Sequence, residues 1–124
     1  MFFYNTPEQK IEENYQAGET VGGQRIVYVL NDKYYYADKD NLNIVNYTLA
    51  LSEQAVDING FGDLLFVGEW EEVSWNWDDE KGLFLGSNGL ITQTPPTSGL
   101  LIEIGTIISA TKIFFEIQDI IEIL

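Results

Sequence analysis

Short runs of β-branched and aromatic residues, separated by turn residues, dominate the chain. Two such runs span residues 25–30 and 33–37, and only Asn31 and Asp32 lie between them. Both of these residues tolerate the positive φ that a two-residue turn requires. The pattern therefore predicts a β-hairpin at this point.

Further apolar runs continue to the end of the sequence. We expect strands at 44–51, 55–58, 63–73, 100–107, 112–117 and 120–124. Residues 64–67 are apolar at consecutive positions, which is typical of a strand buried on both faces, and the pattern alternates after them. About ten short strands with frequent turns predict an all-β fold, either a small sandwich or a barrel.

Two tryptophans lie two residues apart in the run Ser74-Trp75-Asn76-Trp77. On a strand these side chains share one face, so we expect them to fill the core or a subunit interface. The alternative is a stacking platform for a ligand such as a sugar ring, formed by Trp70 and Trp75.

The strongest turn signals follow these tryptophans. Asn88-Gly89 lies between two apolar runs and predicts a second hairpin, because glycine supplies positive φ. Pro95-Pro96 then predicts a stiff end to the segment. We interpret Trp75, Trp77, Asn88, Gly89, Pro95 and Pro96 as a structural motif or a subunit interface.

Residues 1–16 differ from the rest and predict a separate N-terminal arm or a short helical segment ahead of a β domain at 17–124. Thr6, Pro7 and Gln9 resemble a capped helix start, although the segment is too short to be a stable helix alone. An ordinary strand is the alternative. The residues with which such an arm would attach to another surface are Phe2, Phe3, Tyr4, Ile11 and Tyr15.

Composition narrows the functional classes. The 124 residues fit one domain, and 20 acidic against 6 basic residues give a net charge of −14. Such a chain repels nucleic acid and anionic membrane surfaces, since phosphate binding requires lysine and arginine. No run of about 18 apolar residues is present, so no membrane span is expected. A solvated acidic exterior is the simplest interpretation.

The sequence offers little catalytic chemistry. Cysteine and histidine are absent, which excludes thiolate zinc sites and nucleophiles that depend on either residue. Residues 38–43 lack the glycine and glutamate of a calcium loop. The acidic clusters 69–72 and 78–80 lie beside tryptophans, as in a glycosidase, but polar turns and one strand face explain them more simply. We predict no enzyme activity and no catalytic, cofactor or metal residues.

The order of features from Ala17 onward resembles a module of tailed-bacteriophage head-fibre and capsid-decoration proteins, which also occurs in tail-fibre and minor structural proteins. The resemblance is carried by Ala17-Gly18-Glu19 before the 25–30 run, Tyr34-Tyr35-Tyr36-Ala37-Asp38, Ser74-Trp75-Asn76-Trp77, residues 83–96, Gly105 and Ser109-Ala110-Thr111. Residues 1–16 do not align with the family.

This resemblance implies a structural protein of the virion, assembled in the host cytoplasm. The expected partners are further copies of the chain, as a homotrimer, and the phage capsid or other virion proteins. The family motif brings no catalytic residues. The alternative is a tail-fibre or receptor-binding module that recognises a host surface glycan.

Overall fold

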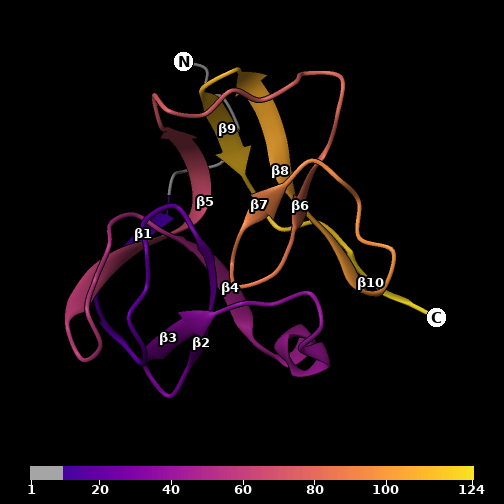
Figure 1. Ribbon diagram of the computed structural model, residues 1–124. Coiled ribbons are helices and arrows are strands. Elements are labelled where there is room, and N and C mark those ends of the chain that lie inside the picture. Colours follow the sequence, from indigo (N-terminus) through magenta and orange to yellow (C-terminus); the bar gives the residue numbers. More distant parts are fainter. Residues whose placement is uncertain (1–9) are drawn as a thin grey trace, which may run out of the picture.

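The computed structural model describes residues 10–124, and their side chains from residue 14 onward. It confirms the all-β class (Figure 1). The strands of this described part are β1 (Lys10–Ala17), β2 (Ile26–Leu30), β3 (Lys33–Tyr36), β4 (Thr48–Ser52), β5 (Phe61–Glu71), β6 (Leu83–Leu85), β7 (Ile91–Thr92), β8 (Gly99–Ser109), β9 (Lys112–Phe115) and β10 (Ile120–Ile123).

The first five strands form a closed ring. They follow the order β1-β3-β2-β4-β5, and β1 pairs with β5 as well, which closes the ring. The β1–β3 pair is parallel, whereas the other pairs in the ring are antiparallel. The hairpin predicted at Asn31-Asp32 is confirmed, with φ values of 53° and 63° at the two turn residues.

The remaining strands form a second sheet that shares β5 with the ring. The second half of β5, Gly68–Glu71, pairs with β9, and the order continues through β8 and β6 to β7. Strand β10 pairs with the first residues of β8. In Figure 1, β5 runs from the ring of β1–β4 up to β9 and β8.

Two apolar clusters fill the structure, and strands β2, β4 and β5 contribute to both. The ring cluster consists of Ala17, Val21, Val27, Tyr34, Ala50 and Leu64. The central cluster consists of Ile26, Ala37, Ile44, Leu49, Leu51, Leu65, Leu83, Leu85, Leu100, Ile102, Ile104, Ile113 and Phe115. Successive strand residues point to opposite faces, so neighbours such as Leu64 and Leu65 enter different clusters. The prediction that residues 64–67 include a strand segment buried on both faces agrees with the burial of Leu64 and Leu65.

The prediction of a separate N-terminal arm over residues 1–16 is wrong for residues 10–16, the part that the structure describes. Residues 10–16 belong to β1, in which Ile11 pairs with Leu65 and Tyr15 pairs with Gly62. Pairing with β5 satisfies the backbone N–H and C=O groups of this segment. A helix of this length and composition would not be stable alone. The sheet therefore begins earlier than the predicted boundary at Ala17. Phe2, Phe3, Tyr4 and the proposed helix start lie outside the described residues.

Three strand predictions were wrong in part. Residues 44–51 divide into a 3-10 turn, Leu42–Asn46, and strand β4, because the Asn41 side chain caps the turn by accepting from the Asn43 backbone. Residues 55–58 provide only an isolated bridge between Val56 and Val21. Trp75 and Trp77 lie in an irregular segment rather than on a strand.

Glu53 allows a test of how burial affects stability. One carboxyl oxygen is buried without a hydrogen-bond partner in the described structure, and burial, followed by the charge of Asp63, raises the pKa of Glu53. Folding therefore favours the protonated form. The stability that this group contributes is complete below its ordinary pKa and is lost as the pH rises through the raised value.

We predict that Glu53→Gln increases the free energy of unfolding at pH 7 relative to the wild type. The gain should shrink towards zero below about pH 4, where both states of the wild type are protonated. Urea denaturation across this pH range measures it. Asp79→Asn, which removes an exposed charge, controls for reduced overall repulsion; an equal gain in both variants would contradict the prediction.

Candidate functional site

The Asn88-Gly89 hairpin docks its tip into the first half of the chain. The predicted turn is confirmed, with φ of 52° at Asn88 and 74° at Gly89. The Gly89 N–H donates to the Ala37 carbonyl at 2.6 Å, and the Ile26 N–H donates to the Gly89 carbonyl at 2.8 Å. A Cβ on Gly89 would lie 2.6 Å from the Ile26 carbonyl oxygen. Only glycine fits both this conformation and this approach.

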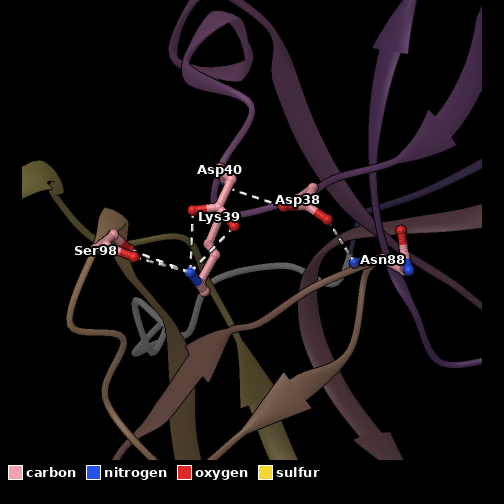
Figure 2. A network of polar contacts seen from close by, with 5 residues as sticks. All are labelled: Asp38, Lys39, Asp40, Asn88 and Ser98. Carbon is pink, nitrogen blue, oxygen red and sulfur yellow. Dashed lines mark hydrogen bonds and ion pairs between the residues drawn. The ribbon is translucent and has the colours of Figure 1, made fainter.

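The polar side chains of one segment, Asp38-Lys39-Asp40, add to the backbone contact between the hairpin tip and the first half of the chain. The Asn88 N–H donates to Asp38 Oδ2 at 3.0 Å. The Lys39 ammonium pairs with the Asp40 carboxylate at 3.0 Å and reaches the Ser98 carbonyl at 3.4 Å. Figure 2 shows Lys39 between Asp40 and Ser98, and Asp38 turned towards Asn88.

The same segment also contacts the start of β8. The Leu100 N–H donates to the Lys39 carbonyl at 2.7 Å. Gly99 has a φ of 79°, and a Cβ there would overlap that carbonyl. We call this set of contacts the joint: Ile26, residues 37–40, residues 86–89 and residues 98–100. It connects the ring to the second sheet mainly through backbone hydrogen bonds.

The tryptophans pack against the interior. Trp75 and Trp77 contact each other, with ring centroids 5.2 Å apart, and both lie against the central cluster together with Trp70. The backbone N–H of Trp77 donates to the Ala110 carbonyl at 2.8 Å, and this bond holds the segment of the two tryptophans against the β8–β9 turn. The indole N–H groups of Trp70 and Trp77 are buried without a partner in the described structure. All three tryptophans are therefore partly buried side chains at the border of the central cluster.

Pro95 and Pro96 lie in the loop between β7 and β8. They line a groove of about 440 Å³ together with Lys39, Gly86, Ser87, Leu90, Thr92, Thr94 and Thr97. This loop thus borders the joint.

The acidic clusters have structural partners. Glu69 pairs with Lys112 at 3.3 Å, and the Thr111 hydroxyl donates to Glu71 at 3.0 Å. Asp78 accepts from the Glu80 N–H within its turn. No group of three or more acidic residues in the described part is arranged to hold a metal ion.

The sequence reasoning missed a groove of about 580 Å³ lined mainly by aromatic and aliphatic side chains. We call it the aromatic groove, and its lining consists of Tyr15, Tyr47, Thr48, Leu49, Phe66, Val67, Glu116, Ile117 and Ile120. Of these residues only Tyr15 was singled out from the sequence. The others come from segments far apart in the chain, so no local spacing could reveal them.

Strand β10 has one open edge. It pairs with β8 on one side, from Ile120 opposite Ile102 to Ile123 opposite Gly99, and no described strand pairs with its other side. Ile121 is 54% exposed there. The apolar final run noted in the sequence therefore borders the surface.

No helix in the described residues is long and apolar enough to cross a membrane. No family model, curated protein or solved structure matches the chain. The function must therefore be inferred from the residues of the chain and their arrangement.

The joint predicts a specific cost for a methyl group at Gly89. Gly89→Ala should lower the free energy of unfolding by about 3 kcal/mol, because it adds both backbone strain and a clash with the Ile26 carbonyl. Gly86→Ala is the matched control in the same hairpin, where the new methyl would meet atoms at ordinary distances of 3.4 Å. If chemical denaturation gave equal losses in the two variants, Gly89 would not be the more constrained of these two glycines.

Proposed function

We propose that this chain is a structural protein of a bacteriophage virion, a head-fibre or capsid-decorating subunit that acts by self-assembly and docking. The proposal begins from the sequence resemblance over residues 17–124. Within the resembling motif, Gly86, Asn88 and Gly89 belong to the joint, where they fix backbone shape. A motif devoted to shape is what a passive building block requires.

The open edge of β10 is the observation that carries the self-assembly part of the proposal. An unpaired strand edge presents backbone N–H and C=O groups that another chain can pair with. Soluble proteins commonly protect such edges with charged residues or proline, and residues 120–124 carry a single charge, at Glu122, among four apolar residues. The half-exposed Ile121 adds apolar surface that a neighbouring copy would bury.

The proposed partners are further copies of the chain, as a homotrimer, and the capsid or other proteins of the virion. Ile11 and Tyr15 lie on β1, within the sheet, so the attachment role falls to Phe2, Phe3 and Tyr4 in this proposal. The net charge of −14 keeps assembled copies soluble and favours docking on a basic surface.

The alternative, a receptor-binding module that recognises a glycan, receives less support. It assigned sugar stacking to Trp70 and Trp75, and both indoles pack against the central cluster. A stacking platform needs an indole face open to solvent, and both indoles are only partly exposed. We therefore place the structural role first.

Sedimentation equilibrium tests the self-assembly. We predict that the protein sediments at micromolar concentration as an oligomer with three times the chain mass of 14.1 kDa. Ile121→Lys should weaken association at least tenfold, because it places a charge on the apolar edge strand.

The matched control is Val73→Lys, since Val73 is an exposed apolar residue away from β10, 84% accessible. It should leave the oligomer intact. A wild-type protein that sediments as a monomer would overturn the proposal, and equal weakening by both lysines would remove β10 from the interface.

A further inference from the structure

The aromatic groove lies where the two apolar clusters meet. Tyr15 and Phe66 pack against the ring cluster, whereas Leu49, Ile117 and Ile120 belong to or pack against the central cluster. Neither cluster fills the space between them. The fold therefore leaves a surface groove of about 580 Å³ whose walls come from both parts of the molecule.

The aromatic walls of this groove are held in place. Tyr47 stacks on Tyr28 with centroids 5.5 Å apart and planes 21° apart, and Tyr28 stacks in turn on Tyr35 at 5.3 Å. On the other side, Tyr15 contacts Phe66 at 5.9 Å. Side chains fixed by such contacts lose little freedom when a ligand binds, so the site is pre-organised.

Glu116 gives the groove its charge. It is the single charged residue among the side chains described as lining the groove, and it is exposed. None of the three ion pairs in residues 14–124 involves its carboxylate. Aromatic faces beside a carboxylate attract a cation, through the ring quadrupole and through direct charge.

We propose that the aromatic groove binds a lysine or arginine side chain carried by an extended apolar segment of another protein. The cationic head would lie at Glu116 against the rings of Tyr15, Tyr47 or Phe66. Neighbouring apolar residues of the segment would contact Ile117 and the other aliphatic lining. The chain's charge of −14 increases the rate of encounter with such a segment.

A glycan fits this lining less well. A sugar ring carries hydroxyl groups around its whole edge, and each one that loses water needs a polar partner. Besides the two tyrosine hydroxyls, the groove offers only Thr48 and Glu116 as polar side chains. Its aliphatic walls suit a peptide better.

This site differs from the β10 edge and does not depend on the virion role. Strand β10 contributes only its first residue, Ile120, to the groove, whereas self-assembly was assigned to the open side of that strand around Ile121. The two surfaces can therefore be tested separately on one protein.

The test is an NMR titration of the full chain with acetyl-Leu-Arg-Leu-amide and with its citrulline analogue, which has the same shape without the charge. We expect the arginine peptide to bind about fivefold more tightly. The shifted amides should cluster at Tyr47, Val67 and Glu116. Added salt should reduce the difference.

Two variants decide the assignment. Glu116→Gln should abolish the preference for arginine, while Glu122→Gln, which removes an exposed carboxylate of β10 outside the groove, should preserve it. Equal affinity for the two peptides, no binding of either, or shifts away from the groove would overturn the proposal. A neutral oligosaccharide such as maltohexaose that shifts the groove amides when the peptides do not would assign the groove to a glycan instead.

Discussion

The close approach of the Gly89 backbone to Ile26 and Ala37 is the constraint on which the rest of the structure depends. At this point the tip of the β6–β7 hairpin takes the place of a strand beside the ring, accepting from one residue and donating to the other. Beside it, Asp38 accepts from the Asn88 backbone, and Lys39 contacts Asp40 and Ser98 (Figure 2). Without a glycine at the tip, the second sheet could not sit this close to the first.

Strand β5 provides the other connection between the two parts. It pairs with β1 and β4 in its first half and with β9 in its second half, so both sheets share its backbone. Alternate residues of β2, β4 and β5 enter different clusters, which makes the ring and the second sheet one folded unit. The aromatic groove follows from this arrangement, because it lies at the surface between the two clusters and neither of them fills it.

Local patterns predicted the elements whose cause is local. Both two-residue turns, Asn31-Asp32 and Asn88-Gly89, were found because positive φ restricts the residue types that can form them. The all-β class followed from the density of β-branched and aromatic runs. The strand assumed for Trp75 and Trp77 was wrong, since the position of their segment depends on contacts with the β8–β9 turn. Both side chains are partly buried against the central cluster.

The sequence did not predict the features that depend on contacts between distant parts of the chain. For residues 10–16 the sequence left a strand only as the alternative to an arm or a short helix, because the pairing with β3 and β5 that forms the strand is non-local. The aromatic groove joins Tyr15, Tyr47, Phe66 and Glu116, which are separated by up to a hundred residues. Within residues 83–96, the structure shows that Gly86 and Gly89 take part in the joint.

The most direct test of the central claim, that this is a structural component of a phage particle, is quantitative mass spectrometry of gradient-purified particles from a lysate of the host that carries the gene. The account predicts that the chain co-purifies with the particles at many copies per virion, in a constant ratio to the major capsid protein. A chain that remains in the soluble lysate and is absent from the particles would contradict it.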